Sequence, residues 1–151
     1  GLMIINSNNQ VFVGQRFDTA RMSFGNSDGW QMPQGGIDEG ETPFQTALRE
    51  LKEEVGTDKV DIIVESQHWY EYELPDALKG ILWGGRFHSQ KQKWFLFRFL
   101  GDDKDINIHS NAAEFAYCKW GEKEELLELI VDFKKDVYQH VLNEFKDFLR
   151  K

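Results

Sequence analysis

Apolar residues at the start of the chain gather in short runs with a preference for β structure. Residues 2–5 and 11–17 are two such runs, and they flank the polar segment 6–10, whose Asn and Ser residues favour a turn. We therefore predict a β-hairpin there. Runs at residues 59–66 and 68–74 have the same character, and residues 91–100 form the most apolar and aromatic segment, which predicts a central strand.

The remaining segments predict a loop and two helices. Residues 73–90 hold Pro75 and three glycines, which indicate a long surface loop. Residues 122–130 and 133–150 have helical character. In the second of these helices, five apolar residues recur at helical spacing and should pack on the sheet: Phe133, Val137, Val141, Phe145 and Phe148.

A further helix is predicted from about residue 42 to residue 56. Thr42 is suited to cap it, Pro43 to occupy its first position, Gln45 to close a capping box, and Gly56 to end it. At about 100° per residue, one arc of this helix is apolar and predicts a core-facing stripe. The members of that arc are Phe44, Ala47, Leu48, Leu51 and Val55. With its three helices between strands, the chain reads as one α+β domain over residues 1–151.

Three glutamates, Glu50, Glu53 and Glu54, occupy a second arc beyond the edge of the apolar stripe. Arg49 lies one turn before Glu53 and can pair with it, but one guanidinium cannot balance three carboxylates. Two interpretations follow from the residues alone. The glutamates form a solvated anionic face, or they form a site for a hard divalent cation such as Mg²⁺ or Mn²⁺, which prefers oxygen ligands.

Composition narrows the kinds of partner. The chain of 151 residues carries 18 Lys plus Arg against 26 Asp plus Glu, a formal net charge of -8, so we expect no DNA partner. An anionic substrate would have to be met by local cations or metal. The single Cys118 and the absence of a long apolar run predict a cytoplasmic protein without a membrane span. The sequence opens at Gly1 without Met, which leaves open that a native amino-terminal segment precedes it.

Fixed spacings around the glutamates carry a family resemblance. Gly35, Glu41, Arg49, the glutamates and Gly56 follow the signature of the Nudix hydrolases, G-x5-E-x7-R-E-U-x-E-E-x-G-U, and only Thr57 departs from it. The chain thus resembles that family. The resemblance implies an αβα sandwich with a mixed β-sheet between helices, and hydrolysis of a nucleoside diphosphate linked to another group. It also favours the cation site over the solvated face.

The same resemblance implies roles for the residues of the signature. Glu50, Glu53 and Glu54 would bind more than one Mg²⁺ or Mn²⁺, together with Glu114 from an opposite loop and a carbonyl of Gly36. Gly35 would let the backbone approach the ions. Glu41 and Arg49 would support the loop and orient the carboxylates. Glu50 or Glu53 would accept the proton of the attacking water, with Glu50 favoured by the resemblance.

Outside the signature, "WQMPQGGI", "SQKQKWFL" and "FKKDVYQHVLNEF" resemble the bacterial RNA pyrophosphohydrolases, a group also described as dinucleoside polyphosphate hydrolases. The implied substrate is a 5′-triphosphorylated RNA end or a dinucleoside polyphosphate such as diadenosine tetraphosphate. The implied substrate-binding residues are Arg16, Tyr72, Lys91, Lys93, Phe133 and Lys134. For Phe133 core packing is an equal alternative, for Tyr72 a structural role, and for Lys91 and Lys93 a solvent face.

Two other functions remain open from the sequence. The first is a housekeeping pyrophosphatase for small nucleotides, which shares the glutamate helix but needs a different pocket. The second is a non-catalytic sensor of nucleotides or RNA on the same fold, although a pure binder would not require the intact carboxylate set. The sequence does not indicate protein partners.

Overall fold

The computed structural model describes residues 1–16, 30–73, 89–109, 115–130 and 134–150. Its main feature is a six-stranded mixed sheet in which β3, β2, β1, β7 and β4 lie in that order and β8 also pairs with β2. The strand bounds are β1 Leu2–Ile5, β2 Val11–Arg16, β3 Trp30–Gln31, β4 Val60–Glu65, β7 Phe95–Phe99 and β8 Phe115–Gly121.

Two predictions about this sheet are confirmed. Strands β1 and β2 are antiparallel neighbours, as expected of the hairpin, and β7 lies in the interior of the sheet between β1 and β4. Strands β1 and β7 run parallel, while β2 pairs with β3 and β8, and β4 with β7, in antiparallel fashion. Parallel neighbours need a long connection, and here residues 6–94 connect β1 to β7.

The predicted strand over residues 91–100 is wrong in its first part. Lys91 and Gln92 belong to β6 (Ser89–Gln92), which pairs with β5 (Tyr70–Glu73) in a separate two-stranded sheet. Lys93 and Trp94 lie between β6 and β7, so the chain leaves one sheet and enters the other there. Both ends of the predicted loop 73–90 are therefore strand, and residues 74–88 lie outside the described residues.

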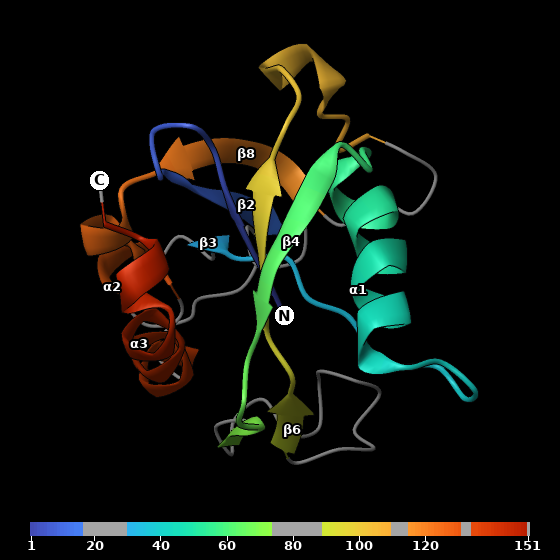
Figure 1. Cartoon of the computed structure of the whole chain (residues 1–151), viewed down its shortest axis with the longest axis vertical. Coiled ribbons are helices and arrows are strands. Elements are labelled where there is room, and N and C mark those ends of the chain that lie inside the picture. The colour runs from blue at the N-terminus through green and yellow to red at the C-terminus, as the bar shows by residue number, and fades with distance from the viewer. Residues whose placement is uncertain (17–29, 74–88, 110–114, 131–133, 151) are drawn as a thin grey trace.

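Helices cover both faces of the main sheet (Figure 1). On one side lie α1 (Pro43–Glu50) and the π-helical turn η2 (Leu51–Val55) that continues it. On the other side lie α2 (Leu126–Leu129) and α3 (Lys135–Glu144). Short 3₁₀ turns cover Asp103–Asp105, Lys123–Glu125 and Lys146–Phe148. This arrangement is the predicted αβα sandwich. In the described part of the chain, none of the helices is long and apolar enough to cross a membrane.

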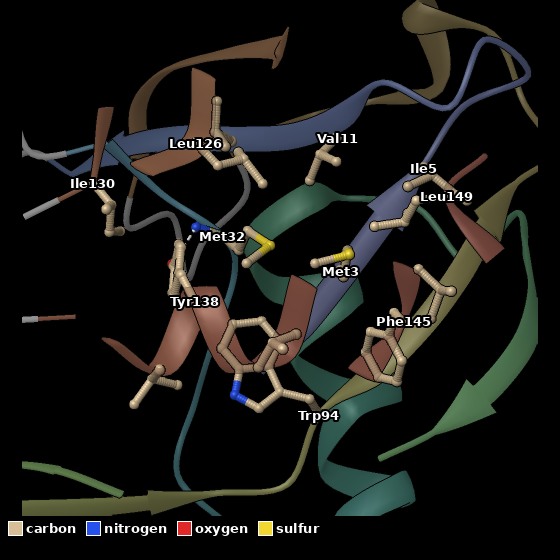
Figure 2. Packing of buried hydrophobic residues seen from close by; sticks show 14 residues of the cluster. Met3, Ile5, Val11, Met32, Trp94, Leu126, Ile130, Tyr138, Phe145 and Leu149 are labelled. Atoms are coloured by element: carbon tan, nitrogen blue, oxygen red, sulfur yellow. Dashed lines mark hydrogen bonds between the residues drawn. The ribbon is translucent and has the colours of Figure 1, made fainter. Parts of the chain in front are cut away.

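The sheet separates two hydrophobic clusters, and β1 contributes to both. Met3 and Ile5 pack with α2 and α3, whereas Leu2 and Ile4 pack with α1 and η2. This alternation follows from the two-residue period of a strand, and it explains why β1 is apolar throughout. Figure 2 shows the cluster on the α3 side, where Trp94 and Tyr138 lie near Met3 and Met32.

The apolar pattern of α3 and the residues after it is mostly confirmed. Val137, Val141 and Phe145 are buried against the sheet as predicted. Phe148 is a correction, since it is 44% exposed, and Leu149 is buried in its place. The reason is that α3 ends at Glu144 and a 3₁₀ turn follows, which changes the residue that faces the core. Phe133 lies outside the described residues.

Candidate active site

The glutamate helix begins and ends as the sequence predicts. The Thr42 hydroxyl accepts from the Gln45 N–H at 3.1 Å, and the Gln45 side chain accepts from the Thr42 N–H at 2.9 Å. Pro43 occupies the first helical position. At the other end, Gly56 adopts a left-handed conformation with φ 80°, which a residue with a side chain rarely does.

The last turn of this helix departs from the regular α-helix assumed above. Leu51–Val55 is π-helical, and the Gly56 N–H donates to the Leu51 carbonyl at 3.1 Å. A π turn holds more residues than an α turn, so the glutamates after Glu50 are rotated relative to a 100° spacing. Such turns inside helices are frequent at functional sites.

The predicted core-facing stripe of this helix is partly wrong. Ala47, Leu51 and Val55 are buried, but Phe44 is 37% and Leu48 is 39% exposed. In contrast, Glu50 is only 6% exposed and Glu54 is 0% exposed. The buried face is thus shifted toward the glutamates, and two of the three carboxylates lie inside the molecule. Only Glu53 remains half-exposed.

Gly35 lies directly against the Glu50 carboxylate. A Cβ placed on Gly35 would lie 2.0 Å from Cδ and 2.1 Å from Oε1 of Glu50, closer than any real contact. A Cβ on Gly36 would meet no atom within 4 Å. The two adjacent glycines thus differ, because only Gly35 makes room for a carboxylate.

Arg49 joins the loop to the helix carboxylates. Its Nη1 donates to Glu50 Oε1 at 2.8 Å and to Glu53 Oε2 at 3.2 Å, so the predicted pairing with Glu53 is confirmed. Its Nη2 donates to the Gly36 carbonyl at 2.8 Å, and its Nε and Nη2 both bind Glu41, at 2.8 and 3.0 Å. One planar guanidinium therefore sets the relative positions of the loop and two glutamates.

These contacts change the acid–base behaviour of the pair. The hydrogen bond from Arg49, helped by the Asp38 N–H, lowers the pKa of Glu41 from 4.5 to about 2. The hydrogen bond to Glu41 also raises the pKa of Arg49 above its ordinary value. Both groups stay charged over the whole neutral range.

The segment before the signature, residues 30–34, connects four elements at this end of the sheet. The Met32 N–H donates to the Tyr138 hydroxyl oxygen of α3 at 2.7 Å, and the Pro33 carbonyl accepts from the Leu2 N–H at 2.9 Å. The Gln34 N–H donates to Glu54 Oε2 at 3.1 Å. The Gln34 side-chain oxygen accepts from Gln92 Nε2 at 2.7 Å. The segment thus links α3, β1, β6 and η2.

Lys134 lies beside this segment. It is buried just before α3, and its Nζ donates to Gln31 Oε1 at 2.8 Å. Lys91 is exposed, with its Nζ 3.9 Å from Glu71 Oε2, and the Nζ of Lys93 lies 5.6 Å from the centre of the Trp69 ring. The structure therefore does not bring these three lysines into one described cluster.

Other predicted site residues are only partly described. Arg16 ends β2, where its backbone pairs with Phe115, and the backbone of Tyr72 pairs with Gln90 in the small sheet. Glu114 and Phe133 lie outside the described residues. Their proposed contacts with substrate remain predictions.

The donor set suits a hard divalent cation, although the described part of the chain holds no group of three or more His, Cys, Asp or Glu side chains arranged around one point. Glu50 and Glu53 approach closely enough for one Arg49 nitrogen to bridge their carboxylates. Both supply only oxygen, which Mg²⁺ and Mn²⁺ prefer. Of the other predicted ligands, Glu54 accepts from the Gln34 N–H, the Gly36 carbonyl accepts from Arg49, and Glu114 is not among the described residues.

Sequence reasoning missed three buried glutamines near these carboxylates, Gln31, Gln34 and Gln92. A signal was present, because glutamine is rarely buried and two of the three flank Met32–Pro33 directly before the signature. The sequence does not show which buried groups they bind, since their partners come from the residue before α3, from η2 and from β6.

Comparisons with known proteins agree with this architecture. The RNA pyrophosphohydrolase of Rickettsia prowazekii is 49% identical over 150 residues, which cover 99% of this chain and 89% of that protein. The RNA pyrophosphohydrolase of Rickettsia conorii is 48% identical over the same shares.

Solved structures share the fold. The E. coli dihydroneopterin triphosphate pyrophosphohydrolase superposes with a TM-score of 0.69 at 24% identity, over 94% of each chain. A C. elegans Ap4A hydrolase superposes with a TM-score of 0.65 at 21% identity, over 99% of this chain and 96% of that one. A family model described as the NUDIX domain matches residues 1–141. This chain therefore belongs to the NUDIX family.

Proposed function

We propose that this protein is a divalent-metal-dependent pyrophosphohydrolase. Its substrates are 5′-triphosphorylated RNA ends, dinucleoside polyphosphates such as diadenosine tetraphosphate, or both, and it acts in the cytoplasm. The observation that carries the proposal is the burial of Glu50 and Glu54 on a helix that leaves apolar Phe44 and Leu48 exposed. Burying carboxylates is costly, so a fold that keeps them needs a compensating ligand or partner.

The relatives support the choice of substrate. The Rickettsia proteins named RNA pyrophosphohydrolase are nearly half identical to this chain over almost its entire length. The C. elegans neighbour is named for Ap4A, a dinucleoside polyphosphate, although its low identity bears on the fold alone. Both kinds of substrate carry a polyphosphate chain beside a nucleoside, so one site could process both.

Glu50, Glu53, Glu54, Glu114 and a Gly36 carbonyl are the groups that would hold Mg²⁺ or Mn²⁺. When bound, the metal neutralises phosphate oxygens and acidifies a water molecule. Glu50 would accept the proton of that water, because its carboxylate is buried beside Gly35 and held by Arg49 on one oxygen. Arg49 holds Glu50 and Glu53 in place through hydrogen bonds from one nitrogen, while Glu41 holds Arg49.

The cations near the site would bind the substrate. Lys134 is buried beside Gln31. Because the chain has a net charge of -8, an anionic substrate needs a local cation, and Lys134 would bind its phosphate. Arg16, Tyr72, Lys91, Lys93 and Phe133 would contact the first nucleotides or their phosphates. Phe133 would do so by stacking on a base.

The test is a substrate panel with Mg²⁺ and Mn²⁺ for the wild type and for Glu53→Gln. We expect metal-dependent release of pyrophosphate or orthophosphate from triphosphorylated RNA, and of ATP from diadenosine tetraphosphate. Glu53→Gln should reduce both rates by more than about 100-fold while the fold stays intact, because the change removes an ionic ligand but little volume.

Other outcomes would select another function. Faster hydrolysis of nucleotide sugars or single nucleoside triphosphates would favour a housekeeping pyrophosphatase. Tight nucleotide binding without metal-dependent product release would favour a sensor. Full activity of Glu53→Gln at saturating Mg²⁺ would remove Glu53 from the mechanism.

A further inference from the structure

A chain of hydrogen bonds runs from the hydrophobic core to the carboxylate of Glu54. The Trp94 indole Nε1–H donates to Gln92 Oε1 at 3.1 Å, and Gln92 Nε2 donates to Gln34 Oε1 at 2.7 Å. The backbone N–H of Gln34 in turn donates to Glu54 Oε2 at 3.1 Å. All four residues are buried.

The direction of this chain is set by chemistry at both ends. An indole nitrogen can only donate, so the Gln92 oxygen must face Trp94, and its amide nitrogen must face Gln34. A backbone N–H can only donate and an ionised carboxylate can only accept. Neither amide can therefore be turned over without losing a buried hydrogen bond, and leaving a buried polar group without a partner destabilises the fold.

The far end of the chain is anchored firmly. The Trp94 N–H donates to Ser66 Oγ at 3.0 Å, and the Trp94 carbonyl accepts from the Ser66 N–H at 2.7 Å. The indole ring meets the Tyr138 ring edge-on, with centroids 5.5 Å apart. Figure 2 shows Trp94 deep in the cluster beside α3, so its indole N–H is a fixed reference point.

We infer that Gln92 and Trp94 are positioning residues that hold Gln34, and through it the Glu54 carboxylate, in the orientation needed to bind the divalent cation. This inference rests on the proposed function, because it takes Glu54 to be a metal ligand. Neither Gln92 nor Trp94 belongs to the family signature, and both are buried. They act by fixing the position of Gln34, whose backbone N–H binds Glu54 Oε2.

The test uses Gln92→Met, which keeps the volume but removes both hydrogen bonds, and Trp94→Phe, which removes the first donor. Mn²⁺ binding is measured by electron paramagnetic resonance of the free ion, without substrate, next to kcat, KM and the melting temperature. We expect Gln92→Met to weaken Mn²⁺ binding and lower kcat by about 10-fold, with a smaller change in KM. Trp94→Phe should have a smaller effect in the same direction.

A matched control is Gln139→Met, the same change at an exposed position of α3, which should leave Mn²⁺ binding and kcat unchanged. An NMR readout on the wild type does not depend on any variant of Gln92. The indole N–H resonance of Trp94, assigned by its loss in Trp94→Phe, should shift when Mg²⁺ is added. In Glu54→Gln that shift should be reduced.

The outcomes separate the two proposals. If Gln92→Met lowers the melting temperature but leaves Mn²⁺ affinity unchanged, Gln92 is merely structural and the inference is wrong. If Gln92→Met does not fold, two other results together would overturn the inference. The Trp94 resonance of the wild type would not shift when Mg²⁺ is added, and Trp94→Phe would bind Mn²⁺ with unchanged affinity. If Glu54→Gln binds Mn²⁺ as well as the wild type, it is the assignment of Glu54 as a ligand that fails.

Discussion

The two helical layers on either side of the sheet bury different chemistry. Helix α3 buries Val137 and Val141, as its amphipathic pattern predicts, together with Tyr138. The α1–η2 helix buries Glu50 and Glu54 while Phe44 and Leu48 stay exposed. Burial of apolar groups stabilises a helix on a sheet, whereas burial of carboxylates costs several kcal/mol per ion. The contrast therefore indicates that α1–η2, which also packs Ala47, Leu51 and Val55 into the core, carries a cost of burying carboxylates that α3 does not carry.

The two helices also differ in how firmly their ends are held. The α1–η2 helix has a complete capping box, a π turn and a left-handed Gly56, so both of its ends and the glutamates between them are held closely. Lys134 at the start of α3 makes no side-chain cap. Precise placement of an element is worth its cost where a fraction of an ångström matters for chemistry.

The largest expected effect comes from Glu54→Gln. Because this change removes a buried charge but keeps an acceptor for the Gln34 N–H, Mn²⁺ affinity and turnover should fall by more than about 100-fold. The melting temperature without metal should stay the same or rise. Isothermal titration with Mn²⁺ and thermal unfolding measure the two effects.

Val141→Ala in α3 should do the reverse, lowering the free energy of unfolding by about 1–3 kcal/mol with kcat unchanged. A large loss of stability in Glu54→Gln would contradict the comparison of the two helices, because it would mean that the buried carboxylate stabilises the fold.

Next in size are Leu51→Ala and Leu48→Ala, which compare the two sides of the helix. Leu51 is fully buried between η2 and the sheet, so its truncation should lower the free energy of unfolding by about 2–5 kcal/mol. Leu48→Ala should cost less than Leu51→Ala, about 1 kcal/mol, because Leu48 is already 39% exposed in the folded protein. Urea denaturation checks both values. Equal losses would mean that Leu48 is covered in solution.

Gly35→Ala and Gly36→Ala sharpen the view of the site. A methyl group on Gly35 overlaps Glu50, whose carboxylate must move, so kcat should fall by about 10–100-fold. Gly36→Ala meets open space and should change kcat by less than about threefold. Steady-state kinetics on the preferred substrate measure both, with circular dichroism to verify folding. Similar losses in the two variants would show that backbone freedom, rather than room for Glu50, is what the glycines provide.

The smallest expected effect concerns Glu41 and pH. The folded pKa of about 2 lies below the ordinary 4.5, so ionised Glu41 stabilises the fold above pH 4.5 and this contribution is lost as the pH falls toward 2. The difference in melting temperature between wild type and Glu41→Gln should therefore be constant near neutrality and shrink below pH 4.5. Glu39→Gln, an exposed change in the same loop, is the control. A difference that does not depend on pH would argue against the Arg49 pairing.

The sequence predicted several elements because their causes are local. A capping box depends on residues three apart, a left-handed helix end on Gly56, and the β1–β2 hairpin on the polar turn between two apolar runs. The predicted burial of Phe44 and Leu48 fails for a reason that is not local. Both residues lie in the regular turns of α1, before the π turn, and they are exposed because the buried face of α1 is formed by Thr46, Ala47 and Glu50.

The sequence by itself determined the fold class, the family signature and the presence of a carboxylate-rich helix, because these follow from residue types at fixed short spacings. Only the tertiary structure decided which of those carboxylates are buried and what holds them. Gly35 meets Glu50, and Trp94, Gln92 and Gln34 reach Glu54, across contacts between residues far apart in the chain. Such contacts depend on how α1, β6 and η2 pack together, and no local spacing encodes that packing.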